Sequence, residues 1–521
     1  MRGSGQVWRA LERARVMNLD KAGGNPPEAE GGMAISRRRV LAALGGGFAA
    51  AALPRWPAYA QPNLKVAIVG GGLAGLSALD TLRAHGVDAT LYEARAAVGG
   101  RTRSVRGVFA ADYAFDEGAQ LVNSDHDDML RLIRRFGIRM VARQGFGPSE
   151  EIQIGRSGTA VPEVRLVAAL RGIAARIDAA ARRVDEGDAA AAADIDRLSV
   201  KDYLDRHGLR PGDARDALEA TIRTEYGAEP GATSALELIF NLPVVEGRDL
   251  NRLGNSDELY LVSGGAAQIA ERLAAEHQPR IRLNKYLTEL RMTGSGVRLD
   301  FSDGSHAEAD RVILALPAPL LREILFHLPL LPMESGWREA LDEVGLGRNE
   351  KLIVGYDSQP WRRRPGFGGA IWAARGFSEI WDAASMAPAP GSGALCYFLG
   401  GDQVDAAAQV PSRELAARFT AVARRVIPGL PEPNGRIRRT RWCDDPLTRG
   451  AYSSFRPGQL TRFASLLTLE EEGRARASAA GPLLFAGEWL SADWAGFMNG
   501  AVQTGRIAAE AALVPAAALA A

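Results

Sequence analysis

Three closely spaced glycines and a carboxylate carry the clearest chemical signal in this chain. The apolar run 65–69 leads through the pattern G-x-G-x-x-G into a helical pattern over residues 76–84. The motif consists of Gly70, Gly72, Leu73, Ala74 and Gly75. Its glycines permit, in order, a tight turn, a close approach to a pyrophosphate and close packing of helix on strand, and the helix N-terminus attracts phosphate. Glu93 ends the next apolar run, where a ribose-binding acid is expected, so the spacing predicts a dinucleotide site.

A second glycine segment follows this acid directly and indicates which dinucleotide is bound. Its residues are Glu93, Ala94, Arg95, Gly99, Gly100 and Arg101. The pattern E-A-x-x-x-x-G-G-R resembles the segment that follows the second strand in flavin amine oxidases. The two glycines let the backbone pass close to a cofactor, and Arg101 can offset pyrophosphate charge. Dehydrogenases that bind NAD have no counterpart to this segment, so the resemblance implies FAD.

The C-terminal part of the chain carries the most specific resemblance. Residues 485–488 read F-A-G-E and residues 494–502 read W-A-G-F-M-N-G-A-V. Both resemble the flavin-containing monoamine and polyamine oxidase family, and the similarity runs from about Lys65 to Ala512. In that family a helix N-terminus in this segment faces the flavin, where its dipole stabilises negative charge. The resemblance assigns to the cofactor site Gly487, Glu488, Gly496, Phe497 and Met498, and also Gly118, Ala119, Gln120, Leu287 and Trp442.

The mode of flavin attachment follows from one position of the resemblance. Residues 450–458 are similar to the segment that carries a flavin-linked cysteine in some family members. Ala451 stands at the cysteine position, and Cys443 is out of register with it. The resemblance therefore implies non-covalent FAD.

Three side chains are expected to act on the substrate. Tyr452 and Phe497 match the two family positions whose rings form an aromatic cage in front of the flavin, although two core aromatics are the plain alternative. Lys351 matches a lysine that is linked through water to flavin N5, and a buried lysine shifts its pKa readily. A surface lysine is the alternative at this position.

The resemblance implies an FAD-dependent amine oxidase with a small-molecule amine as substrate and dioxygen as acceptor. A hydride would pass to flavin N5, the imine would hydrolyse to aldehyde and ammonia or an amine, and hydrogen peroxide would form. An L-amino-acid oxidase would need an arginine facing the flavin, and none is evident near residues 120–122. A flavin desaturase or isomerase, and a flavoprotein without turnover, remain as alternatives on the same fold. Which amine is oxidised is left open.

Composition excludes several other classes of function. The chain has 521 residues, with 63 basic and 62 acidic side chains, so neither nucleic acid nor an anionic membrane is an expected partner. The six histidines form no metal-binding pattern, and we expect no metal site. Cys396 and Cys443 define no disulfide framework, and their pairing stays open. A homodimer is one option for the assembly, and no stable membrane anchor is expected.

The first sixty residues resemble a targeting segment. Residues 36–41 read S-R-R-R-V-L, which is similar to the twin-arginine export signal. A short apolar run over residues 40–53 and the A-x-A site at residues 58–60 complete the pattern. A disordered alanine-rich tail is the alternative. Met33 can begin the signal, which leaves open whether residues 1–32 belong to the natural protein. The pattern predicts a periplasmic enzyme.

Cofactor segments alternate along the chain with substrate segments. We expect an α/β fold in which a Rossmann-type FAD-binding domain is interleaved with an α+β substrate-binding domain, as in amine oxidases and p-hydroxybenzoate hydroxylase. The predicted segments are residues 1–60 for the extension and signal, 61–125, 256–320 and 441–521 for the FAD-binding domain, and 126–255 (mostly helical) and 321–440 for the substrate-binding domain.

Overall fold

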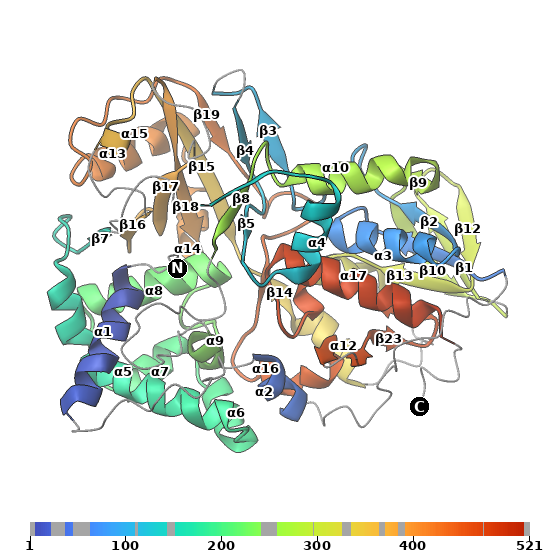
Figure 1. Cartoon of the computed structure of the whole chain (residues 1–521), viewed down its shortest axis with the longest axis horizontal. Helices are drawn as coiled ribbons and strands as arrows, with labels where there is room; N and C mark the ends of the chain where they lie inside the picture. Colours follow the sequence, from blue (N-terminus) through green and yellow to red (C-terminus); the bar gives the residue numbers. More distant parts are fainter. Residues whose placement is uncertain are drawn as a thin grey trace.

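The protein, seen here in a computed structural model, folds into two lobes that face one another across a cavity (Figure 1). The structure describes residues 6–21, 37–44, 63–109, 113–142, 152–240, 258–294, 296–325, 335–363, 370–383, 391–471 and 474–514. One lobe holds a parallel sheet between helices, and the other holds an antiparallel sheet beside a group of helices. This arrangement confirms the predicted α/β class with two interleaved domains.

The parallel sheet is the core of the first lobe. Its strand order is β23 (Ser478–Ala480), β24 (Leu483–Phe485), β13 (Arg311–Leu314), β1 (Lys65–Val69), β2 (Asp88–Tyr92) and β9 (Ile281–Arg282). All neighbouring strands are parallel except β23 and β24. The two apolar runs read from the sequence form β1 and β2, and β13 and β24 are equally buried, because strands covered by helices on both faces need continuous apolar side chains.

Two helices pack against this sheet and closely on each other. They are α3 (Leu73–Ala84) and α17 (Met498–Ala512). A Cβ atom built on Gly505 of α17 would lie 2.1 Å from the Ala74 carbonyl oxygen of α3, so only glycine permits this approach. Both helix N-termini are thereby brought to the same end of the sheet, where open α/β sheets bind ligands.

Smaller elements complete this lobe. They are α10 (Ala267–Glu276), η2 (Gln278–Arg280), the hairpin sheet β10 (Leu287–Met292), β11 (Val297–Phe301) and β12 (His306–Ala309), the pair β3 (Ser104–Arg106) and β4 (Ala114–Asp116), the sheet β5 (Leu121–Val122), β8 (Tyr260–Val262) and β6 (Met140–Ala142), the pair β21 (Leu469–Glu471) and β22 (Arg474–Arg476), and η4 (Glu488–Leu490).

The second lobe carries the substrate-binding elements. Its sheet has the order β19 (Ile437–Arg439), β15 (Asn349–Tyr356), β18 (Gly393–Gly400), β17 (Glu379–Asp382), β16 (Ala370–Ala373) and β7 (Ile152–Ile154). Its helices are α5 (Glu163–Asp185), α6 (Ala189–Asp196), α7 (Val200–Arg206), α8 (Asp213–Tyr226), α9 (Ala235–Phe240), α13 (Pro360–Arg363), α14 (Asp402–Ala407) and α15 (Ser412–Ala423). Helices α11 (Ala318–Leu325) and α12 (Ser335–Glu343) lie beside the parallel sheet instead, because α11 contacts β10 and the Trp337 ring of α12 stacks on Phe485 of β24. The short pair β14 (Gly345–Leu346) and β20 (Ser453–Ser454) joins the lobes.

Three elements pack across the predicted domain boundaries. Helix α4 (Asp127–Arg135) was expected in the substrate block but packs on α17, where Asn499 Oδ1 accepts the Met129 amide at 3.0 Å. Conversely, α16 (Gln459–Arg462) and η3 (Ala464–Leu466) lie in the last cofactor segment but join the core of the helical group. Local sequence pattern predicts an element and not the partner against which it packs, so such boundaries are missed.

Two stretches of the expected targeting segment pack on the folded chain, which the sequence interpretation did not foresee. Helix α1 (Gln6–Lys21) lies along α5, and α2 (Arg37–Leu44) contacts α5, α6, α16 and η3 (Figure 1). Apolar residues of both helices belong to the main core. The A-x-A site at residues 58–60 lies outside the described residues. None of the described helices is both long enough and apolar enough to cross a bilayer.

Candidate active site

One cavity between the lobes gathers nearly all residues that the sequence assigned to cofactor and substrate. The predicted residues on its wall are Gly70, Gly72, Leu73, Ala74, Glu93, Ala94, Arg95, Gly99, Gly100, Arg101, Gly118, Ala119, Gln120, Leu287, Lys351, Trp442, Tyr452, Gly487, Glu488, Gly496, Phe497 and Met498. Gly75 is the exception, because it packs inside the lobe and does not line the cavity. The sequence motifs therefore converge in space from three distant parts of the chain.

The glycine turn before α3 has the shape of a pyrophosphate cradle. A Cβ atom on Gly72 would meet no heavy atom within 4 Å, so this backbone faces open space in the cavity. A Cβ atom on Gly75 would instead lie 1.9 Å from the Gly70 carbonyl oxygen. Gly72 thus exposes backbone for a ligand, whereas Gly75 permits the turn to pack on β1. The free N–H groups at the start of α3 add a positive field at the same place.

Glu93 occupies the position expected for a ribose-binding acid. One carboxylate oxygen accepts the Gly71 amide at 2.6 Å, and the other accepts the Arg95 amide at 2.7 Å. The side chain is buried yet lines the cavity. Two amide donors hold the carboxylate in one orientation, and its remaining lone pairs can accept ribose hydroxyl groups. This carboxylate acceptor, together with the Gly72 cradle, fits the adenosine diphosphate part of FAD.

Arg101 and Glu488 connect the second and third motifs. Arg101 Nη1 lies 2.8 Å from Glu488 Oε1 and 2.6 Å from the Ala451 carbonyl oxygen. Glu488 Oε2 accepts the Ser453 hydroxyl at 2.7 Å and the Gly496 amide at 2.8 Å. The arginine was expected to offset pyrophosphate charge; in this structure its Nη1 donates to Glu488 and to the Ala451 carbonyl oxygen. One buried carboxylate therefore fixes the loop before Tyr452 and the loop before α17.

The aromatic residues expected at the substrate end lie where α17 begins. Phe497 is the N-cap residue of α17, and its ring contacts the rings of His126 and Trp494. Tyr452 donates its hydroxyl to the Thr224 carbonyl oxygen of α8. The Cβ position of Gly496 is 4.0 Å from Tyr452 Cβ, which places the tyrosine beside the start of the helix. Both rings line the cavity at the end where the α17 dipole would meet a flavin ring.

Lys351 reaches the cavity from β15. Its Nζ donates to the carbonyl oxygens of Asp116 at 2.9 Å and Gly118 at 2.8 Å, and to Gln120 Oε1 at 3.2 Å. Burial lowers the pKa of this ammonium group, against the opposing effect of nearby carboxylates. All three N–H groups of Lys351 Nζ donate to protein oxygens, so a bound water would have to replace one of these hydrogen bonds. The longest of them, to Gln120, is the one we expect it to replace. The lysine thereby also fixes the loop 116–120 on the cavity wall.

The cavity also contains residues that sequence reasoning missed. They are the carboxylates Glu225, Glu258, Glu379 and Asp493, the rings Trp372, Trp381 and Phe398, and the guanidinium groups Arg37 and Arg362. Trp372 and Trp381 lie on the neighbouring strands β16 and β17. Their strands are only four residues long, too short for the alternation of a half-buried strand to stand out. No local motif marks the carboxylates.

No cysteine is among the described residues of the cavity wall. Cys396 and Cys443 are both free thiols, which answers the pairing question left by the sequence for this structure. Among the described residues, Asp80, Glu276 and His277 come close enough together to hold an ion. Arg135 already pairs with both carboxylates of that group, which lies outside the cavity.

Comparison with known proteins agrees with this geometry. Residues 73–513 match the family model of the flavin-containing amine oxidoreductases. Flavin-containing amine oxidase B of Sus scrofa is 25% identical over 457 residues, covering 85% of each chain. A flavin-containing amine oxidase of Oncorhynchus mykiss is 25% identical over 468 residues, covering 86% of each chain.

Solved structures share the same fold. A putrescine oxidase with bound putrescine superposes with a TM-score of 0.72 at 23% identity, covering 86% of this chain and 99% of that one. Cyclohexylamine oxidase from Brevibacterium oxydans gives 0.70 at 22% identity, covering 87% of this chain and 99% of that one. Since the family model spans most of the chain and the cofactor motifs meet in one cavity, this chain belongs to the flavin-containing amine oxidoreductase family and is an FAD-dependent amine oxidase.

Proposed function

We propose that this enzyme oxidises a small amine with dioxygen as acceptor. For a primary amine the balanced reaction is RCH2NH2 + O2 + H2O → RCHO + NH3 + H2O2. Bound FAD supplies the two-electron acceptor at N5 and the route to dioxygen. The observation that carries the proposal is the single cavity in which the flavin motifs, two aromatic rings and a buried lysine meet.

The protein's own groups orient the amine and exclude water. Tyr452 and Phe497 present aromatic faces at the substrate end of the cavity, where they can hold an uncharged amine with its α carbon toward the flavin. No protein base is needed if the amine arrives unprotonated. Lys351 can hold a water in place of its Gln120 contact, for imine hydrolysis or for proton delivery during reoxidation.

The charges of the cavity favour an amine over an α-amino acid. An amino-acid oxidase needs an unpaired arginine for the substrate carboxylate. Arg37 and Arg362 reach the cavity, but Glu237 and Asp382 neutralise them at 2.6 Å each. Burial first, and then the negative charges of Glu225, Glu258 and Glu379, raise the pKa of Tyr452. A cavity with this surplus of carboxylates attracts cationic molecules, as amines are before they lose a proton.

The decisive experiment is anaerobic reduction of the purified flavoprotein, followed at the flavin absorbance band. Putrescine is the first probe because a putrescine oxidase shares the fold. The panel also contains n-butylamine, benzylamine and common L-amino acids. We expect bleaching by an amine and recovery in air with one peroxide per turnover. Bleaching only by amino acids would assign the enzyme to the L-amino-acid oxidases, and no bleaching by any compound would refute the proposed chemistry.

Non-covalent attachment of FAD forms part of the proposal. Ala451 stands at the position of the flavin-linked cysteine, and Cys443 is a partly buried free thiol. Acid precipitation should therefore leave all the flavin in the supernatant. A yellow pellet would show a covalent bond that the sequence position does not predict.

Export by the twin-arginine route is also proposed, on the basis of residues 36–41 and the A-x-A site at 58–60. Conservative replacement of the arginine pair (Arg37→Lys with Arg38→Lys) should retain the flavoprotein in the cytoplasm. The exported wild-type protein should begin at residue 61 on N-terminal sequencing. An exported protein that still begins before Arg37 would refute cleavage at this site.

A further inference from the structure

Helix α2 inserts a cation into the wall of the amine cavity. Arg37, its first residue, lines the cavity and is 8% exposed. Its Nη1 lies 2.6 Å from Glu237 Oε2, and its Nη2 lies 3.3 Å from Glu237 Oε1. Glu237 itself is 1% exposed and is absent from the cavity wall, because the arginine covers it. The guanidinium group therefore separates a buried carboxylate from the space that receives substrate.

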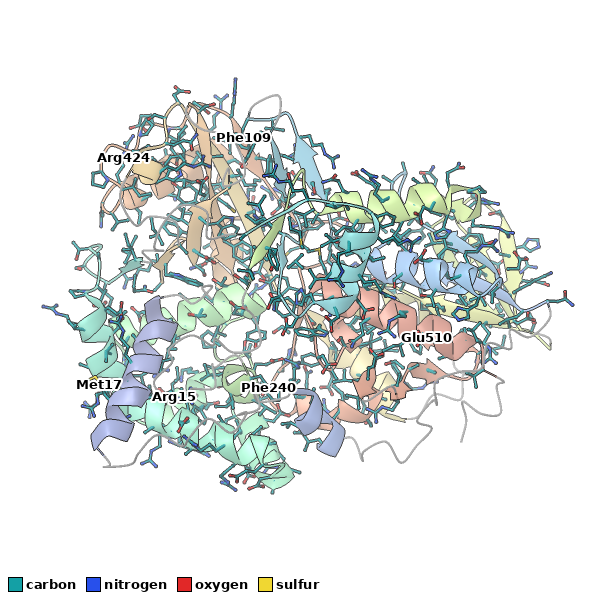
Figure 2. The ribbon with its side chains drawn as sticks, viewed as in Figure 1. Arg15, Met17, Phe109, Phe240, Arg424 and Glu510 are labelled. Carbon is teal, nitrogen blue, oxygen red and sulfur yellow. The ribbon has the colours of Figure 1, made fainter. Side chains whose placement is uncertain are left out.

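The groups around Arg37 form a complete binding site for a cation. The guanidinium carbon lies 5.3 Å from the ring centre of Phe240 and 5.8 Å from that of Phe455. Figure 2 shows Phe240 next to α2, at the end of α9. The Tyr226 hydroxyl donates to the Glu237 carbonyl oxygen at 3.1 Å and so ties α9 to α8. A carboxylate flanked by two aromatic rings binds ammonium as well as guanidinium groups.

Glu237 would be left as an unpaired buried carboxylate if Arg37 moved away from it. Glu237 and Phe240 belong to α9, and Phe455 directly follows β20, so none of the three belongs to α2. If α2 leaves, a nearly buried carboxylate loses its partner and opens onto the cavity, which is strongly unfavourable unless another cation replaces the arginine. The protonated second amino group of a diamine has the charge and size to do so.

The remainder of α2 closes the wall behind the arginine. Val40 and Leu41 are buried in the same core as Phe240 and Phe455. The helix contacts α5, α6, α16 and η3 through this face. Arg37 is thus the residue of α2 that lines the cavity, and Val40 and Leu41 anchor the helix in the core behind it.

We propose that α2 is a built-in inhibitor of this enzyme: Arg37 occupies a cation subsite formed by Glu237, Phe240 and Phe455, and departure of α2 frees that subsite for the distal ammonium group of a diamine substrate. The substrate part rests on the proposed amine oxidase function. An intact chain is then restrained by its own N-terminal segment. Removal of that segment opens the cavity and lets the enzyme prefer substrates that carry a second positive charge, such as diamines.

The first test compares flavin reduction by putrescine and by n-butylamine in the full-length holoenzyme. If α2 is docked about 90% of the time, the apparent Kd for a competing ligand is raised about tenfold. Arg37→Ala should therefore lower the apparent Kd of putrescine about tenfold and that of n-butylamine less. Adding Glu237→Gln to this variant should abolish the gain for putrescine and leave n-butylamine unchanged. The double variant also removes the unpaired buried charge, which protects against misfolding.

Arg13→Ala is the matched control, since Arg13 of α1 pairs with Glu163 of α5 at 2.6 Å and does not line the cavity. It should leave both apparent Kd values unchanged. Equal putrescine Kd values in wild type, Arg37→Ala and the double variant would overturn the inference.

A second measurement does not depend on turnover. Amide hydrogen exchange of residues 37–44 in the wild-type holoenzyme should accelerate when putrescine is added and not with n-butylamine. Unchanged exchange at saturating putrescine would refute displacement of α2. Accelerated exchange without any flavin reduction would uphold the subsite and refute the proposed oxidase chemistry, so the two failures are distinguishable.

Discussion

Two glycines of one motif should respond differently to replacement by alanine: at Gly72 the change should weaken FAD binding, and at Gly75 it should lower the free energy of unfolding. Gly72→Ala places a methyl group where no heavy atom lies within 4 Å, at a backbone φ of −75° that alanine adopts freely. Gly75→Ala places its methyl carbon 1.9 Å from the Gly70 carbonyl oxygen and 3.3 Å from Ile68 Cγ2. The first change fills space meant for the cofactor. The second forces the turn away from β1.

The sizes of the two effects follow from these contacts. A methyl group at Gly72 pushes the pyrophosphate away from the N–H groups at the start of α3. Loss of one such charge-assisted hydrogen bond costs about 2 kcal/mol, which weakens FAD binding about 30-fold. At Gly75 the overlap is with backbone, so the main chain must move, and we expect a loss of about 3 kcal/mol in the free energy of unfolding. Gly72→Ala should leave that free energy within about 0.5 kcal/mol of wild type.

Two assays separate these outcomes. The Kd of FAD is measured by fluorescence during reconstitution of deflavinated protein, and the free energy of unfolding is measured by urea titration of that same protein. Gly172→Ala is the control: it lies on the exposed face of α5 with no atom within 4 Å, and it should add about 1 kcal/mol of helix stability without changing the Kd. A wild-type Kd in Gly72→Ala would refute the assignment of this turn to the pyrophosphate.

Three further substitutions test the rest of the cavity. Lys351→Met should slow reoxidation by dioxygen about 100-fold while amine reduction changes less, measured by stopped-flow absorbance; equal slowing of both half-reactions would contradict a role in reoxidation. Glu488→Gln removes the partner of Arg101, so the free energy of unfolding should fall by about 2 kcal/mol and FAD should dissociate faster; an unchanged dissociation rate would exclude the coupling. For Asp116, burial raises the pKa from 3.8 to about 6, so the folded protein holds this proton more tightly than the unfolded chain. The stabilisation that this proton gives is present below pH 3.8 and is lost as the pH rises through 6. Relative to Asp116→Asn, the wild-type free energy of unfolding should therefore fall by about 3 kcal/mol over that pH range. Wild-type and Asp116→Asn stabilities that change with pH in parallel would refute the raised pKa.

The cofactor end of the cavity could be predicted from sequence because its chemistry is local. Gly70 and Gly72 follow β1 directly, and Glu93 follows β2, its neighbour in the sheet. The ends of adjacent parallel strands meet at one edge, so strand order alone brings these residues together. The resemblance then added Arg101 and the start of α17, whose motif is long enough to be specific.

The substrate end could not be predicted in the same way. Glu225 ends α8, Glu258 precedes β8 and Glu379 begins β17, and nothing in their flanking residues marks a common site. They meet only because the helical group and the antiparallel sheet pack on opposite sides of one cavity. The position of Arg37 was missed for a related reason. An arginine-rich segment before an apolar run strongly resembles an export signal. This local pattern does not indicate that Arg37 pairs with Glu237, a buried acid two hundred residues later.

The arrangement around Glu488 indicates which part of the site controls retention of FAD. Its partner Arg101 lies 387 residues away along the chain, and its other oxygen holds Ser453 and the Gly496 amide. With 7% of the Glu488 side chain exposed, displacement of any of these segments would leave a charge unpaired in the interior. FAD bound across the same segments stabilises only the assembled state, so cofactor binding and these ion-pair contacts reinforce each other. Substitutions at Tyr452 or Phe497, whose side chains line the cavity and take no part in this network, should therefore change turnover long before they release flavin.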